Sequence, residues 1–171
     1  DRSGGTPGTS SSHPAGASEG VGERPRRRAT ALITYVDTST LLKRLLDEDG
    51  SDRADVIWEA ADVLVSAATI TVEARAALAA AERAGRLDAD DHATAKEELV
   101  ELLDEVDLVE VTDELIEQAA DLAAAEALRG YDATHLGAAL LVDATVLTSA
   151  DEALCSAAGR RGLHVANPLA P

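Results

Sequence analysis

Short apolar runs alternate along the chain with longer segments in which apolar residues recur every three or four positions. The first apolar run, residues 33–36, leads directly into Asp37 and then into a leucine-rich segment with helical spacing. A short apolar run that ends where a helix begins is typical of a buried parallel strand. We therefore predict a strand over residues 33–36, followed by a helix that Thr38 or Ser39 caps.

The same alternation continues toward the end of the chain. Further strands are predicted at residues 63–66, 108–111, 144–148 and 163–166. Helices are predicted at residues 52–61, 69–84, 88–106, 112–128 and 131–142, and in a short segment that carries Cys155 and ends at Gly159. Strands that alternate with helices form parallel sheets covered on both faces. We therefore expect one α/β domain over residues 32–171, with a three-layer α/β/α fold, a parallel sheet of four or five strands, and its last strand at an edge.

Residues 1–31 differ in composition from the rest of the chain. They are rich in Gly, Ser, Pro and Arg and contain almost nothing to bury, which predicts a disordered tail. The arginine-rich run at residues 24–28 is expected to be solvated, with contact to nucleic acid or an acidic surface as the alternative. Because the chain contains no Met, we also expect the natural reading frame of the domain to start near Leu32.

Charge and composition narrow the classes of function. The chain has 15 basic and 32 acidic residues, a net charge of −17, which argues against broad electrostatic binding to nucleic acid or anionic membranes. No apolar run approaches the roughly 18 residues of a membrane span, and no signal peptide is recognisable. The single cysteine, Cys155, cannot form an internal disulfide and is expected to be a core thiol. A cytoplasmic protein with bound cations or basic partners is therefore expected.

Four acids stand at comparable places in the predicted fold. Asp37 and Asp151 follow strands, whereas Glu73 and Asp132 lie in the first turns of helices. Strand carboxyl ends and helix amino ends share one edge of a parallel sheet, so the four acids are expected to converge there. Each acid alone is also explained as a helix cap or first-turn residue. Together, with no Lys or Arg expected beside them, they would repel one another unless Mg²⁺ or Mn²⁺ bound them.

The segments around these acids, residues 35–39, 69–73, 131–136 and 147–151, resemble PIN-domain ribonucleases, and in particular the VapC toxins of type II toxin–antitoxin systems. The resemblance extends over about residues 32–168, in the order and at the spacing of that family. It implies a PIN-like fold in which the acids bind the metal and are catalytic. The residues so implied are Asp37, Glu73, Asp132 and Asp151.

Three further residues match positions of the family near the metal site. Ser39 and Ser149 stand where the family often has a hydroxyl group, and His135 matches a frequent family position. A second interpretation of His135 is that it is simply a hydrogen-bond partner of Asp132, three residues earlier in the helix. The sequence departs from the family at Asp151, which ends a Thr-Ser-Ala-Asp segment instead of the commoner Thr-x-Asp.

The resemblance favours a Mg²⁺-dependent endoribonuclease, in which a metal-activated water attacks an RNA phosphodiester. The arginines considered for contact with phosphate are Arg75, Arg83, Arg86, Arg129, Arg160 and Arg161. A non-catalytic PIN-like module that binds a partner is the first alternative. A phosphatase with Asp37 as nucleophile is the second, although Ser39 stands where haloacid dehalogenase-like enzymes have a second Asp. The resemblance also implies a VapB-like antitoxin that covers the acidic cleft, and a homodimer. The acidic charge and the absence of a long apolar run predict no membrane partner.

Overall fold

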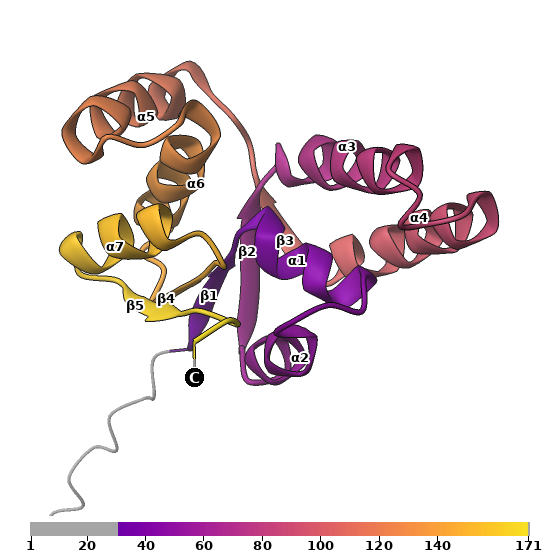
Figure 1. The fold of residues 1–171 in the computed structure, drawn as a ribbon. Coiled ribbons are helices and arrows are strands. Elements are labelled where there is room, and N and C mark those ends of the chain that lie inside the picture. The colour runs from indigo at the N-terminus through magenta and orange to yellow at the C-terminus, as the bar shows by residue number, and fades with distance from the viewer. Residues whose placement is uncertain (1–30, 171) are drawn as a thin grey trace, which may run out of the picture.

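The computed structural model describes residues 31–170 of the chain, and in this range five strands form one sheet (Figure 1). Their order is β3-β2-β1-β4-β5, and every neighbouring pair is parallel. The strands are β1 (Ile33–Val36), β2 (Val63–Ala67), β3 (Val106–Val109), β4 (Val146–Thr148) and β5 (His164–Ala166). The predicted parallel sheet is therefore confirmed, with β5 at one edge.

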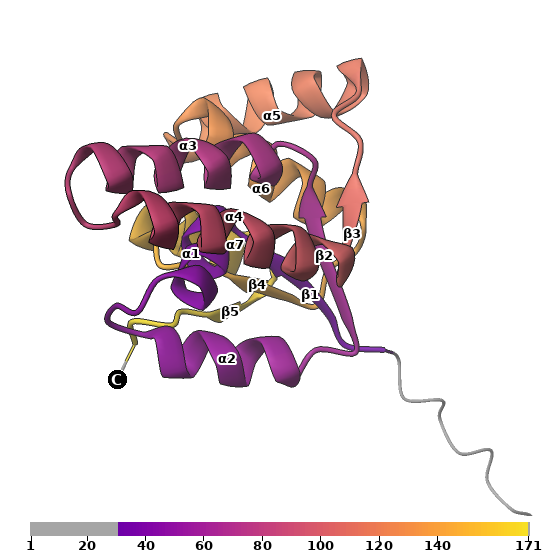
Figure 2. The ribbon, with the colours of Figure 1, turned by 90° about the vertical axis from the view of Figure 1, so that its right-hand side faces the viewer.

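Helices cover both faces of this sheet, which gives the three layers that the sequence predicts (Figures 1 and 2). One face carries α1 (Thr38–Leu45), α2 (Ser51–Glu59), α3 (Ile70–Arg83) and α4 (Ala89–Asp104). The other face carries α5 (Asp113–Glu126), α6 (Gly130–Leu141) and α7 (Glu152–Arg160). Among the described residues, no helix has the length and apolar character that crossing a membrane requires.

Alternation of side chains along the strands produces two apolar cores. Tyr35 and Leu147 point into the core shared with α5, α6 and α7. Val36 and Leu64 point to the opposite face and pack with α1 to α4. Small alanines fill much of both cores, as expected for a chain that contains no Phe and one Trp.

The boundary between α4 and β3 differs from the prediction. Residues 88–106 were expected to be helical and residues 108–111 to form the strand, but α4 ends at Asp104 and β3 begins at Val106. Val106 continues the helical apolar spacing of α4, yet it pairs with Leu64 of β2 and is 7% exposed. Sheet pairing and burial of Val106 therefore set the boundary between α4 and β3. Apolar periodicity alone places the start of the strand two residues too late.

The start of α1 is also corrected by the structure. The helix cap is Asp37 rather than Thr38 or Ser39, because β1 ends at Val36 and leaves one residue before the first helical residue, Thr38. Asp37 has extended backbone angles, and its side chain accepts a hydrogen bond from the backbone N–H of Ser39. The structural interpretation of Asp37 as a cap is thus correct, and its contacts decide whether it has a further role.

The predicted disordered tail, residues 1–31, lies outside the described residues except for Ala31. The structure therefore does not test the predictions for the arginine-rich run or for a start near Leu32.

The strand order reverses between β1 and β4. From β1 the chain turns into α1 on one face, and from β4 it turns into α7 on the other face. The backbone N–H of Asp37 donates to the carbonyl oxygen of Thr148 at 3.0 Å, so the carboxyl ends of the two strands are joined. Open α/β sheets place their ligands in the crevice at such a switch point.

Candidate active site

Asp37 lies at the switch point and is held by two serines. Its Oδ2 accepts hydrogen bonds from Ser39 Oγ at 2.6 Å and Ser149 Oγ at 2.7 Å. Ser149 follows β4 and is fully buried, and Asp37 itself is 6% exposed. The other carboxylate oxygen, Oδ1, lies 3.6 Å from Nε2 of His135. The structure thus brings together four of the residues singled out in the sequence and fixes one oxygen of Asp37.

Glu73, in the first turn of α3, is held from two sides. Thr38 Oγ1 donates to its Oε2 at 3.0 Å, and His135 Nε2 lies 3.1 Å from its Oε1. The alternative that His135 serves Asp132 is therefore wrong, because the imidazole crosses to α3 instead of bonding within its own helix. Thr38 was not recognised in the sequence as a partner of this acid.

A buried tyrosine fixes the other side of the His135 ring. The Tyr35 hydroxyl accepts from the backbone N–H of Ala67 at 2.9 Å and lies 2.8 Å from Nδ1 of His135. When His135 is neutral, Tyr35 donates its proton to Nδ1, which leaves the imidazole proton on Nε2. When His135 is charged, both nitrogens carry protons. In either state Nε2 donates to Glu73.

Charge and burial act in opposite directions on this pair. Burial raises the pKa of the Glu73 carboxyl, but the hydrogen bond and charge of His135 outweigh it, so the pKa is lowered from 4.5. Burial lowers the pKa of the His135 imidazole, but its hydrogen bond to Glu73 and the charge of Asp37 outweigh it, so the pKa is raised from 6.5. The two groups therefore stabilise each other's charged forms.

Asp132 and Asp151 share one arginine. Arg129 Nε donates to Asp132 Oδ2 at 2.7 Å, and its Nη2 donates to Asp151 Oδ2 at 3.0 Å. Asp151 also caps α7, since its Oδ1 accepts from the backbone N–H groups of Ala153 and Leu154. The expectation that no Lys or Arg lies beside the acids is wrong, because Arg129 precedes Asp132 by the three residues that align side chains on a helix face.

Hydrogen bonds and one longer contact, between His135 Nε2 and Asp37 Oδ1 at 3.6 Å, link the four acids in one network. The backbone N–H of Asp151 donates to Ser149 Oγ at 2.9 Å, which links Asp151 to Asp37, and His135 links Asp37 to Glu73. Arg129 then links Asp151 to Asp132. Within residues 31–170, however, no three His, Cys, Asp or Glu side chains are already arranged to hold a metal ion. The four acids are linked at the predicted edge of the sheet, and Arg129 pairs with two of them, Asp132 and Asp151.

The fold is supported by contacts of three other residues considered in the sequence, Cys155, Arg160 and Arg161. Cys155 Sγ donates to the carbonyl oxygen of Ser149 at 3.2 Å, and burial raises the pKa of the thiol to about 11, which opposes a role as nucleophile. Arg160 and Arg161 both donate to Glu126, at 2.8 and 2.7 Å. These two arginines are thus occupied in joining α7 to α5.

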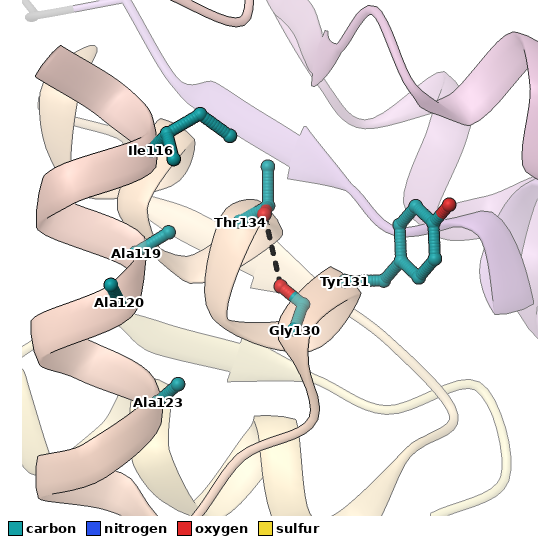
Figure 3. Close-up of a pocket in the computed structure, with 7 residues that line it drawn as sticks. All are labelled: Ile116, Ala119, Ala120, Ala123, Gly130, Tyr131 and Thr134. Carbon is teal, nitrogen blue, oxygen red and sulfur yellow. Dashed lines mark hydrogen bonds between the residues drawn. The ribbon is translucent and has the colours of Figure 1, made fainter. Parts of the chain in front are cut away.

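An apolar groove of about 350 Å³ lies between α5 and the start of α6 (Figure 3). It is lined by Ile116, Ala119, Ala120, Ala123, Gly130, Tyr131 and Thr134. Thr134 donates to the carbonyl oxygen of Gly130, so its hydroxyl is already paired. Tyr131 is 60% exposed and immediately precedes Asp132. The groove therefore opens next to the acid network but is apolar in character.

Comparison with solved structures shows where the same fold occurs. The crystal structure of PAE2754 from Pyrobaculum aerophilum has a TM-score of 0.58 at 23% identity, with 81% of this chain and 87% of that chain covered. The Mycobacterium tuberculosis VapC20, a sarcin-ricin loop cleaving toxin, has a TM-score of 0.57 at 21% identity, with 74% and 95% covered. A toxin–antitoxin complex from Klebsiella pneumoniae has a TM-score of 0.56 at 16% identity, with 79% and 97% covered. These similarities support the fold.

Sequence comparison is more specific. Ribonuclease VapC45 of Mycobacterium tuberculosis (strain CDC 1551 / Oshkosh) is 37% identical over 136 residues, which cover 78% of this chain and 94% of the relative. Ribonuclease VapC49 of the H37Rv strain gives the same values. The sequence profile of the PIN domain matches residues 34–160, a span that contains all four acids. The chain therefore belongs to the PIN domain family, as its four acidic segments predict.

Proposed function

We propose that this PIN-domain chain is a metal-dependent endoribonuclease, the toxin component of a toxin–antitoxin pair, which hydrolyses RNA phosphodiester bonds. The 37% identity to two VapC ribonucleases, over 94% of their length, supports this class of reaction. The observation that carries the proposal is the network that joins Asp37, Glu73, Asp132 and Asp151 at the switch point of the sheet. A ligand crevice is expected at that place.

The chemistry of these side chains fits a hard divalent cation. All four are carboxylates, the oxygen donors that Mg²⁺ and Mn²⁺ prefer, and both ring nitrogens of the network's imidazole, His135, are already paired, with Glu73 and Tyr35. Asp37, Glu73, Asp132 and Asp151 are the residues that would hold the ion. When bound, such a cation supplies positive charge for the phosphate and activates water.

The residues around the acids would orient them for this task. Ser39 and Ser149 fix Oδ2 of Asp37, while Thr38 and His135 fix Glu73. Oδ1 of Asp37 accepts no hydrogen bond from the residues that the structure describes, and His135 is 3.6 Å away. This oxygen is therefore available to a cation, or to accept a proton from a water that attacks phosphorus.

The alternatives are less well supported. An aspartate-nucleophile phosphatase would use Asp37, but Ser39 occupies the place of the second acid and donates to Asp37. A non-catalytic module would have no need for four acids whose orientation is fixed by serine, threonine, histidine and arginine. A phosphoaspartate formed on Asp37 would favour the phosphatase, and absence of RNA cleavage at any metal concentration would favour the module.

The function is tested with the purified chain and a circular single-stranded RNA, which only an endonuclease linearises. We expect cleavage with Mg²⁺ or Mn²⁺, loss of cleavage with excess EDTA, and recovery when the cation is restored. Circular RNA that stays intact over a wide range of cation concentrations and RNA sequences, or is cleaved equally in EDTA, would contradict the proposal.

We also propose an antitoxin partner of VapB type and a homodimer. A net charge of −17 favours a partner that presents basic side chains to the acids, and the similar fold in a toxin–antitoxin complex supports this class of partner. The exposed side chains of Ile116 and Tyr131 beside the α5–α6 groove support an apolar contact between two copies. Light scattering of the chain, alone and with a coexpressed antitoxin, tests both assemblies.

A further inference from the structure

Arg129 contacts two of the four acids in the network, Asp132 and Asp151. Its Nε lies 2.7 Å from Asp132 Oδ2, and its Nη2 lies 3.0 Å from Asp151 Oδ2 and 3.4 Å from Asp132 Oδ1. One guanidinium therefore contacts carboxylates that come from different elements, the first turn of α6 and the cap of α7. The two carboxylates are close enough to be neutralised by a single cation.

The surroundings of Arg129 allow it to leave these acids. Its side chain is 76% exposed, whereas that of Asp132 is 12% exposed. Arg129 immediately precedes α6, and its side chain makes no capping hydrogen bond, so the helix does not depend on its position. Moving the guanidinium into solvent costs little for Arg129, but it leaves a nearly buried carboxylate without its positive partner.

A divalent cation bound by the same carboxylates would supply that partner. A divalent ion held by Asp132 and Asp151 would use carboxylate lone pairs that Arg129 already occupies, and its charge would repel the guanidinium. The arginine does not escape the conflict by losing its proton, because a guanidinium stays charged in proteins. One of the two cations must therefore yield.

We propose that Arg129 is a positioning residue and an internal competitor of the catalytic cation: it holds Asp132 and Asp151 while the cation is absent, and the cation displaces it. This inference rests on the proposed metal-dependent function and assigns to Arg129 a role in setting the cation concentration that the site requires. Arg129 thus keeps Asp132 and Asp151 oriented when no metal is bound. Its competition also weakens the affinity of the site for the metal.

Two roles of Arg129 are distinguished by the metal affinity of the Arg129→Gln variant. Competition with the cation and support of the acids predict opposite changes in that affinity. If Arg129 competes, Arg129→Gln binds Mg²⁺ or Mn²⁺ roughly three- to tenfold more tightly than wild type, as expected for the loss of two ion pairs whose arginine is largely exposed. If Arg129 only arranges the acids for the metal, the same variant binds the cation more weakly. Arg129→Lys retains the charge but loses the planar fork that contacts both acids, and an intermediate affinity is expected.

The experiment measures Mn²⁺ and Mg²⁺ affinity by calorimetry for wild type, Arg129→Gln, Arg129→Lys and the control Arg160→Gln. The control also removes one positive charge, but from an arginine paired with Glu126. In parallel, nitrogen-15 NMR follows the side-chain Nε–H of Arg129 during a Mg²⁺ titration of the wild-type chain. We expect that signal to shift with the same midpoint as metal binding, and the Arg160 signal to stay in place.

The outcomes separate the inference from the function on which it rests. Wild-type metal binding with unchanged or weaker affinity in Arg129→Gln, or an Arg129 signal that is unmoved at saturating Mg²⁺, overturns the role of Arg129 alone. Equal tightening in Arg160→Gln also overturns it, because the effect would then be general electrostatics. No cation binding by any of the four proteins overturns both the inference and the metal-dependent function.

Discussion

The hydrogen-bond partners of Asp37 say more about its role than its identity as an acid does. Its place after a strand is readable in the sequence, and as a helix cap it has an ordinary structural explanation. Two serines separated by 110 residues nevertheless converge on the same oxygen. That convergence depends on the pairing of β1 with β4, and it supports a role that capping alone does not require.

The first prediction concerns Ser149. Its hydroxyl donates to Asp37 and accepts from the backbone N–H of Asp151, so Ser149→Ala leaves both groups without this partner. We expect the free energy of unfolding to fall by about 1–3 kcal/mol, the cost of unsatisfied buried polar groups, and RNA cleavage to fall with it. Chemical denaturation and a cleavage assay measure the two effects.

Ser156→Ala is the matched control, since Ser156 lies on the exposed face of α7. We expect it to change stability by less than about 0.5 kcal/mol and to leave cleavage unchanged. Equal behaviour of the two variants would show that the hydroxyl of Ser149 has no special role.

The residue scale is also where the sequence predicts least about contacts. The positions of the four acids, Ser39, Ser149 and His135 follow from motifs. The partner of His135 does not, because its ring bonds to Glu73 on α3 and to Tyr35 on β1, neither of which is near it in sequence. The contact between Arg129 and Asp132 is different, because a spacing of three residues in the sequence already indicates that the two side chains can meet.

Among the elements, the turn between α1 and α2 is packed against the end of the chain. Gly50, just before α2, has φ of +90°, and a Cβ there would lie 2.8 Å from the carbonyl oxygen of Pro168. A side chain is disfavoured by both the backbone conformation and the contact. The close approach of residues so far apart in sequence explains why this turn needs glycine.

Gly50→Ala is therefore predicted to lower the free energy of unfolding by about 1–3 kcal/mol. The control is Gly159→Ala in α7, where an added Cβ meets nothing within 4 Å. Alanine is the better helix former by about 1 kcal/mol, so this second change should be neutral or stabilising. Thermal melts of both variants test the pair, and a neutral Gly50→Ala would contradict the tight packing.

Helices α5 and α7 are joined by an ion pair that titrates. Glu126 accepts from Arg160 and Arg161, and these hydrogen bonds lower the pKa of its carboxyl from 4.5. Because the pKa is lowered in the folded state, the stabilisation is present above about pH 4.5 and is lost as pH falls through the folded-state pKa. The contribution is expected to be small, since the arginines are largely exposed.

Glu126→Gln should therefore be less stable than wild type at neutral pH and should approach wild-type stability below the folded-state pKa. Glu117→Gln, an exposed position on the same helix, is the control and should show no such pH dependence. Denaturation of the three proteins across this pH range measures the difference. A gap between Glu126→Gln and wild type that persists unchanged at low pH would refute the electrostatic origin.

On the scale of the whole molecule, the alternation of apolar runs and amphipathic segments is sufficient to predict the α/β class and the parallel sheet. It does not give the β3-β2-β1-β4-β5 order, which depends on which strands pair in the folded chain. The start of β3 was placed too late because Val106 satisfies the helical pattern and the sheet equally well. Both the strand order and the start of β3 depend on pairing between strands that lie far apart in the sequence. A local sequence pattern does not contain that information.

The same long-range pairing brings the four acids to one edge of the sheet. Asp37 and Asp151 are brought together by adjacent parallel strands, and Glu73 and Asp132 by helices on opposite faces of the sheet. The sequence places each acid at an element end, but the sheet edge that unites them is a property of the complete fold. That edge is the basis of the proposed cation-dependent cleavage of RNA.

Cleavage of RNA by Asp37→Asn tests this proposal most directly. Asparagine keeps the shape and capping ability of Asp37 and removes one charge, so the fold is retained while the proposed cation ligand is lost. The control is Asp121→Asn, which removes the same charge from an exposed position on α5. In saturating Mg²⁺ we predict cleavage at background level for Asp37→Asn and at wild-type level for Asp121→Asn. Equal cleavage by Asp37→Asn and wild type would contradict the assignment of Asp37 to a catalytic metal site.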